Sequence, residues 1–256
     1  MKTTTVNIFK SSSFLENKYQ IHFVDFEGYS SELLKYIEEH FVMICEGDSD
    51  SDIEVVKQRA RDFFESKSEN TVMGATAEFF IHLYLKSLGY KQECTFFNLE
   101  EGSIKKGFDG YYSKDEVEWI MESKSGYRDS KGSSHWSKVK TAYDDLTDKF
   151  SGNVSNNPWQ NAYNHAQLID VGTSKSIRKN IKLLSDNFTQ KKFTSIEDFN
   201  IIPASTIFLS GKWEDYDLNE IKKKIAGVVS NFKYKDIVII CVTKKSISQF
   251  IEFLNR

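Results

Sequence analysis

The chain has 256 residues, of which 39% are hydrophobic and 28% are charged, and its formal net charge is −3. These values fit a globular protein with one large domain, or a core domain with a small appendage, and they exclude a uniformly basic nucleic-acid coat. Cys45, Cys94 and Cys241 lack the C-x-x-C pairing of a metal site, which predicts reduced thiols and a cytoplasmic location. The apolar runs are too short to cross a membrane, so no membrane partner is expected.

The first part of the chain predicts a mixture of short strands and helices. Residues 20–26 alternate polar and apolar side chains, as a half-buried strand does. Helices are expected from residue 31 to about 41 and over 53–66. Between them, residues 48–52 carry alternate aspartates like the opening of a calcium loop, but the glycine and the distal glutamate of an EF-hand are absent. This loop is therefore expected to be solvated or to cap the following helix.

A third helix is expected from about residue 71 to 88, and its side chains are apolar almost all round. Such a helix is buried on most sides. Glu78 lies among these apolar neighbours, and an unpaired buried carboxylate is costly. It is either half of a structural ion pair or a residue of a functional site. His82 lies one turn further on and could contact a phosphate, but a hydrogen-bonded core histidine is the favoured interpretation.

The rest of the chain predicts an α/β fold with a sheet flanked by helices. Three strands are expected first, near residues 91–98, 107–113 and 117–124. They are followed by helices near 136–150, 159–169, 175–190, 219–232 and 246–255, and by strands near 204–209 and 236–242. We divide the chain into an N-terminal α+β extension or docking lobe, residues 1–68, and a main domain, residues 69–256.

Two consecutive predicted strands carry a group of charged residues. Asp109 lies on the first strand between two glycines, and Glu122 and Lys124 lie on one face of the second, because alternate strand residues share a face. Two carboxylates can hold a hard cation, and a lysine can sit beside the water that the cation activates. The alternative is a salt bridge at a strand edge next to a turn aspartate.

These residue types predict a role for each member of the group. Asp109, Glu122 and the backbone carbonyl of Ser123 would bind Mg²⁺, with Mn²⁺ able to substitute. Lys124 would position the attacking water and offset the negative charge that develops on a phosphate. Glu78 would reach a second metal ion or orient Lys124. The sequence therefore predicts metal-assisted cleavage of a phosphodiester, with Asp109, Glu122, Lys124 and Glu78 as catalytic residues.

Three motifs carry a resemblance to a known family: Gly74-x-x-x-Glu78, Lys106-Gly107-Phe108-Asp109 and Glu122-x-Lys124. They resemble the motifs of the PD-(D/E)xK nuclease superfamily and, more narrowly, of the HamA family, the nuclease subunits of the Hachiman antiphage defence system, which work with the helicase HamB. The resemblance covers about residues 73–150, and the polar stretch 125–127 departs from it. It implies a restriction-endonuclease-like fold, Mg²⁺-dependent DNA cleavage and a helicase partner.

Basic residues follow the site directly and predict contact with DNA. They are Arg128, Lys131, Lys138 and Lys140, with Trp136 among them. Basic groups neutralise phosphates, and an aromatic ring can stack on bases. The alternative is a solvated helix face with Trp136 in the core. The leading hypothesis is a DNA endonuclease that acts as the effector of a defence complex. A catalytically silent subunit that binds DNA or regulates a partner, and an unrelated α/β interaction protein, are the alternatives.

Overall fold

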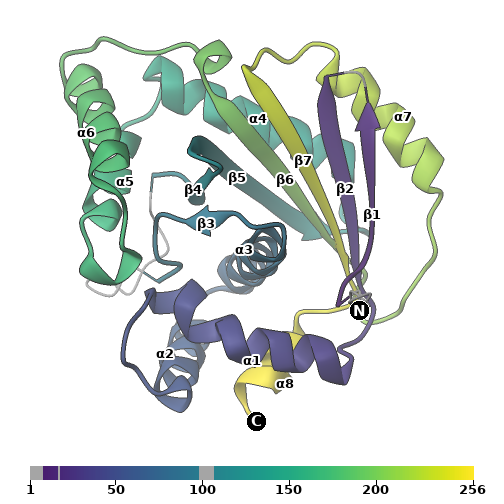
Figure 1. Cartoon of the computed structure of the whole chain (residues 1–256). Coiled ribbons are helices and arrows are strands. Elements are labelled where there is room, and N and C mark those ends of the chain that lie inside the picture. The colour runs from purple at the N-terminus through teal and green to yellow at the C-terminus, as the bar shows by residue number, and fades with distance from the viewer. Residues whose placement is uncertain (1–7, 17, 98–106) are drawn as a thin grey trace, which may run out of the picture.

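The residues described by the computed structural model, 8–16, 18–97 and 107–256, form a seven-stranded mixed sheet in the order β1-β2-β7-β6-β5-β4-β3 (Figure 1). The predicted α/β class with a mixed sheet is confirmed. In chain order the strands are β1 Lys10–Glu16, β2 Tyr19–Phe26, β3 Lys91–Gln92, β4 Gly110–Lys114, β5 Val117–Tyr127, β6 Asn200–Phe208 and β7 Asp236–Lys244.

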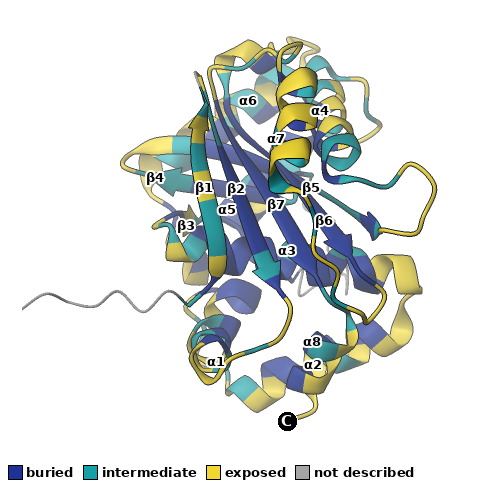
Figure 2. Cartoon of the chain, turned by 90° about the vertical axis from the view of Figure 1, so that its right-hand side faces the viewer, coloured by how far each residue is buried: buried dark blue, intermediate teal, exposed yellow. Residues whose placement is uncertain are grey.

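The centre of the sheet is parallel and its edges are antiparallel. Strands β2, β7, β6 and β5 run in one direction, whereas β1 pairs with β2 and β4 pairs with both β5 and β3 in the antiparallel sense. All nine residues of β6 are buried, which fits the continuous apolar runs of parallel strands covered on both faces. Figure 2 shows this contrast, with β6 and β7 buried and the edge strand β1 partly exposed.

Helices cover both faces of the sheet and enclose two main hydrophobic cores. The cluster on one face draws on α1 Ser31–Glu46, α2 Ile53–Ser66, α3 Glu69–Ser87 and α8 Ser248–Leu254. The cluster on the other face draws on α4 His135–Ser151, α5 Pro158–Ala166, α6 Lys175–Thr189 and α7 Leu218–Val229. Short 3₁₀ turns occur at Ile169–Val171 and Ile196–Asp198. No helix in the described part of the chain combines the length and apolar character needed to cross a membrane.

Polar side chains fix where the helices begin. Asp52 accepts a hydrogen bond from the Glu54 amide at the start of α2, so the acidic loop caps this helix, which was one of the two predicted roles. A capping box formed by Ser134 and Ser137 starts α4. The β4–β5 hairpin turns through Asp115 and Glu116, which both have positive φ angles, as a two-residue turn requires.

The N-terminal region shares the sheet with the rest of the chain. Strand β2 pairs in parallel with β7 from the C-terminal region, and α1 packs against both α2 and α3. Strands from both sides of the predicted boundary at residue 68 therefore lie in one sheet, and a docking role for residues 1–68 stays a prediction. Strand β1 was not predicted, because its serine-rich sequence has no clear alternation of polar and apolar residues.

The strand predicted over 91–98 is wrong in its length. Only Lys91 and Gln92 pair with β4. The chain then leaves the sheet, because the amides of Phe96 and Phe97 donate to the carbonyls of Ile44 and Cys45 at the end of α1. These bonds satisfy carbonyl groups that a helix end leaves without partners. Residue 98 lies outside the described residues.

Candidate active site

Asp109, Glu122 and Lys124 meet where β4 begins beside β5. The Oδ2 atom of Asp109 accepts a hydrogen bond of 2.8 Å from the backbone amide of Ser123. Nζ of Lys124 lies 2.9 Å from Oε1 of Glu122. Pairing of Gly110 with Met121 places Asp109 just beyond the paired end of β4, next to Glu122. Lys106, the first residue of the predicted motif, lies outside the described residues.

Burial makes the charges in this group interact strongly. Glu122 is only 2% exposed. Burial raises the pKa of Glu122, the nearby Asp109 carboxylate raises it further, and Lys149 and Lys124 act in the opposite direction. Burial acts to lower the pKa of Lys124, but the Glu122 and Asp109 carboxylates outweigh it and raise that pKa overall. The Asp109 carboxylate therefore opposes the ionisation of Glu122.

Helix α4 covers the strand face that carries Glu122 and Lys124, and it runs antiparallel to β5. Near its end, Nζ of Lys149 lies 2.5 Å from Oε2 of Glu122. One turn earlier, Oδ2 of Asp145 lies 2.5 Å from Nζ of Lys124. Sequence reasoning missed Asp145 and Lys149. Their i, i+4 spacing indicates that the two side chains share one face of the helix. The sequence does not show that this face lies over β5.

A third residue of α4, Lys138, continues this row of contacts. A Cβ atom built on Gly126 would lie 2.8 Å from Cε of Lys138, so this side chain lies over the glycine. Lys138 is thus the predicted DNA-binding residue that the structure places on the same helix face as Asp145 and Lys149. Trp136 is half-buried, and Nζ of Lys224 lies 4.3 Å from the centre of its ring.

The other predicted DNA contacts lie on the exposed surface. Arg128 pairs with Glu214 at 2.8 Å, and Lys140 pairs with Asp144 at 2.6 Å. Exposed pairs of this kind contribute little to stability and can exchange partners. Lys131 lies in the exposed turn before α4. The role of these residues in DNA binding stays a prediction.

Glu78 belongs to α3, which packs on the opposite face of β5. Burial raises the pKa of the Tyr112 hydroxyl well above its usual value, and Cys94, Glu78 and Asp109 add to this shift. The charges of Glu78 and Asp109 therefore both act on the Tyr112 hydroxyl. In the described part of the chain Lys124 forms ion pairs with Glu122 and Asp145, and the role predicted for Glu78 stays a prediction.

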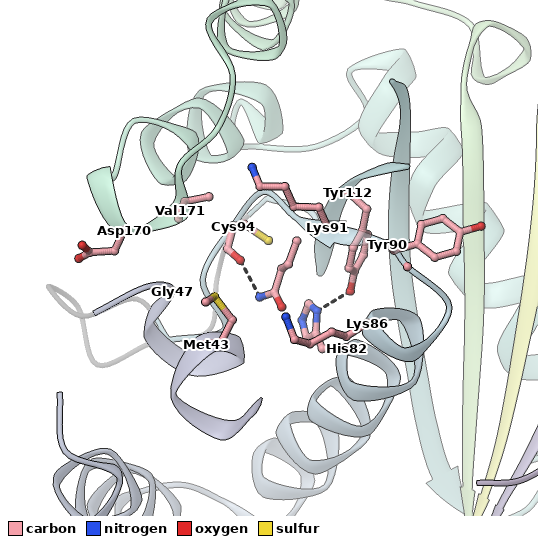
Figure 3. Close-up of a pocket in the computed structure, with 12 residues that line it drawn as sticks. Met43, Gly47, His82, Lys86, Tyr90, Lys91, Cys94, Tyr112, Asp170 and Val171 are labelled. Carbon is pink, nitrogen blue, oxygen red and sulfur yellow. Dashed lines mark hydrogen bonds between the residues drawn. The ribbon is translucent and has the colours of Figure 1, made fainter. Parts of the chain in front are cut away.

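His82 is a core residue, in agreement with the favoured interpretation. It is 1% exposed, and its Nδ1 atom bonds to the hydroxyl of Tyr112. Both residues line a cavity of about 280 Å³ with Lys86 and Lys91 (Figure 3). Nζ of Lys91 bonds to Glu93 and to the carbonyl of Gly172. None of the three residues Asp109, Glu122 and Lys124 lines this cavity.

The carboxylates provide the kind of ligands that a hard divalent ion takes. Among the described residues, no three or more His, Cys, Asp or Glu side chains gather as a metal site. Mg²⁺, however, is usually held by one or two carboxylates, with waters and substrate phosphates as its other ligands. Asp109 and Glu122 supply two such carboxylates, so the donor set fits Mg²⁺. The predicted part of the Ser123 carbonyl stays a prediction.

Comparison with known proteins adds no relative. No family profile matches the chain, and no curated protein sequence matches it significantly. The side chains around β5 therefore provide the evidence for a function.

Proposed function

We propose that this protein is a Mg²⁺-dependent DNA endonuclease whose active site is formed by Asp109, Glu122 and Lys124. The observation that supports this most strongly is the convergence of the three side chains on adjacent residues of β5. Asp109 accepts a hydrogen bond from the Ser123 amide, and Lys124 pairs with Glu122 at 2.9 Å. Two carboxylates that repel each other in a buried site are stabilised when a cation binds between them. A lysine beside them completes the set of groups that phosphodiester hydrolysis needs.

Each residue has a distinct part in the proposed reaction. When bound, Mg²⁺ supplies an activated water and neutralises charge on the phosphate. Asp109 and Glu122 hold the ion, and Asp109 is oriented by the Ser123 amide. Lys124 positions the attacking water and offsets negative charge in the transition state. Asp145 holds the ammonium group of Lys124 in place, since it contacts that group from the exposed side.

The motifs around this site suggest its biological setting. By resemblance to the HamA family, we propose that the enzyme is the effector of an antiphage defence complex and works with a helicase subunit. The net charge of −3 favours dependence on such a partner for DNA targeting, because the chain has no overall basic character of its own. A nuclease without restraint would also attack the host genome.

One observation favours a second candidate, a catalytically silent subunit of nuclease fold. Both oxygens of Glu122 already have a lysine partner, Lys124 on one and Lys149 on the other. A carboxylate neutralised in this way can be purely structural. In that case the protein would bind DNA or regulate a partner without cutting.

Cleavage assays separate these two functions. Purified protein is incubated with linear and supercoiled DNA in Mg²⁺ or EDTA, alone and with a HamB-type helicase. We expect cutting only with Mg²⁺ and its loss in Asp109→Asn. Lys35→Ala, which removes an exposed cation from α1, is the matched control and should cut normally. If the wild-type protein does not cut in any condition, the silent-subunit function replaces the proposed one.

A further inference from the structure

Lys149 contacts Glu122, but it has no role in the proposed cleavage reaction. It lies in the last turn of α4, and its ammonium group lies 2.5 Å from Oε2 of Glu122. The same group lies 5.7 Å from the centre of the Phe108 ring. Its side chain is 18% exposed, whereas that of Glu122 is 3% exposed. Lys149 therefore reaches from near the surface to a buried carboxylate.

The two lysines on Glu122 are not equivalent. Lys124 also contacts Asp145, so it keeps a carboxylate partner if Glu122 changes its contacts. For Lys149, Glu122 is the only ion-pair partner among the residues that the structure describes. Lysine carries its charge on a flexible four-carbon stem, so the ammonium group can leave one partner without movement of the helix.

The local charge balance shows what Lys149 does before an ion arrives. Asp109, Glu122 and Asp145 carry three negative charges, and Lys124 and Lys149 carry two positive charges. Without Lys149, Glu122 would keep Lys124 as its only ion-pair partner among the described residues. A divalent ion on Glu122 would repel the ammonium group at Oε2, because like charges at this distance interact strongly in a buried site.

We propose that Lys149 is an exchangeable counter-ion of this site. It neutralises Glu122 while no divalent ion is bound, leaves Glu122 when the ion binds, and then contacts the substrate phosphate. This inference rests on the proposed function, since it needs a divalent ion at Asp109 and Glu122. It assigns to Lys149 a role in both metal affinity and DNA binding.

Metal titration tests the first half of this proposal. Binding of Mn²⁺ is measured by calorimetry for the wild type, Lys149→Met, Lys149→Arg and the matched control Lys35→Met, which loses an exposed cation on α1. Removal of the competing cation should tighten Mn²⁺ binding about tenfold or more, as expected for a close charge pair. Lys149→Arg and Lys35→Met should differ from the wild type by less than about threefold. Equal affinity in the wild type and Lys149→Met would overturn the proposal.

Thermal melting guards against a folding defect in the methionine variant. In EDTA, Lys149→Met should melt below the wild type, because Glu122 loses a partner. Added Mn²⁺ should raise its melting temperature more than that of the wild type, because a tighter ligand stabilises more. A lower melting temperature with no added response to Mn²⁺ would identify Lys149 as a structural partner only and overturn the proposal.

DNA binding in Ca²⁺ tests the second half. Ca²⁺ takes oxygen ligands, as Mg²⁺ does, so it can occupy the same carboxylates. The affinity of each protein for a short DNA duplex is measured in Ca²⁺ at a fixed salt concentration. Lys149→Met should bind about tenfold more weakly than Lys35→Met, although both variants lose one positive charge. Equal affinities would overturn the contact with phosphate.

Asp109→Asn separates failure of this inference from failure of the proposed function. If the wild type binds Mn²⁺ and Asp109→Asn does not, the proposed metal site is supported even if the Lys149 variants behave like the wild type. If the wild type and Lys149→Met both fail to bind Mn²⁺, the proposed function and this inference fall together.

Discussion

The two faces of strand β5 are covered by helices of opposite character. On one face, α3 packs apolar residues against Trp119 and Met121. On the other, α4 supplies Asp145 and Lys149 as partners for Lys124 and Glu122. The same strand therefore contributes to a hydrophobic core through one set of alternate residues and to a charged site through the other. Buried charge on a strand requires matching charge on the helix that covers it.

Truncation of the α3 face should have the largest effect on stability. Phe79 is fully buried in the core on this face. Phe79→Ala should lower the free energy of unfolding by about 3–5 kcal/mol through lost burial and a residual cavity. Leu183→Ala is the control, since Leu183 is exposed on α6. Urea unfolding measures both, and a loss below about 1 kcal/mol for Phe79→Ala would contradict the assignment of α3 to the core.

Loss of Lys124 should affect activity rather than folding. Lys124→Ala should reduce cleavage about 10²–10³-fold, because a positioned cation next to the phosphate is lost. Its side chain is 26% exposed, so the melting temperature should change much less than in Phe79→Ala. The comparison between the two faces of β5 fails if Lys124→Ala cuts DNA normally, or if it unfolds the protein as strongly as the α3 variant does.

The two faces of β5 also differ in how far the sequence predicts them. The burial of α3 was predictable because its residues are apolar all round. The shared face of Glu122 and Lys124 was predictable because alternate strand residues point the same way. The partners Asp145 and Lys149 were not, because their match to β5 depends on how α4 crosses the strand. The place of β2 beside β7 was equally hidden, since it joins residues far apart in the chain.

Acid should lower the stability of the fold by protonating a buried histidine of α4. His135 bonds to Ser205 and Thr243, and burial lowers its pKa to about 3. The unfolded chain protonates near 6.5, so stability is complete above that pH and falls as the pH drops towards 3. This residue alone should account for about 2 kcal/mol of lost stability between pH 7 and 5.

The variant His135→Gln tests this source of acid sensitivity. Its free energy of unfolding, measured in urea at pH 7 and pH 5, should fall by less than that of the wild type over the same interval. His22, with a pKa lowered to about 4 by burial and by Lys114, should retain its own contribution in both proteins. An unchanged pH dependence in His135→Gln would show that another group is responsible.

The smallest effect is expected on the exposed side of α4. Lys140 pairs with Asp144 one turn away, and both side chains are largely exposed. Lys140→Ala should change the free energy of unfolding by less than about 0.5 kcal/mol. A larger loss in urea unfolding would mean that the polar face of α4 contributes to the fold beyond Asp145 and Lys149.

Manganese soaked into crystals of the wild-type protein tests the central claim most directly. The account predicts an anomalous peak between the carboxylates of Asp109 and Glu122, with the ammonium group of Lys149 moved away from Oε2. The account would be contradicted by crystals that show no manganese at Asp109 and Glu122 and in which Lys149 is still paired with Glu122.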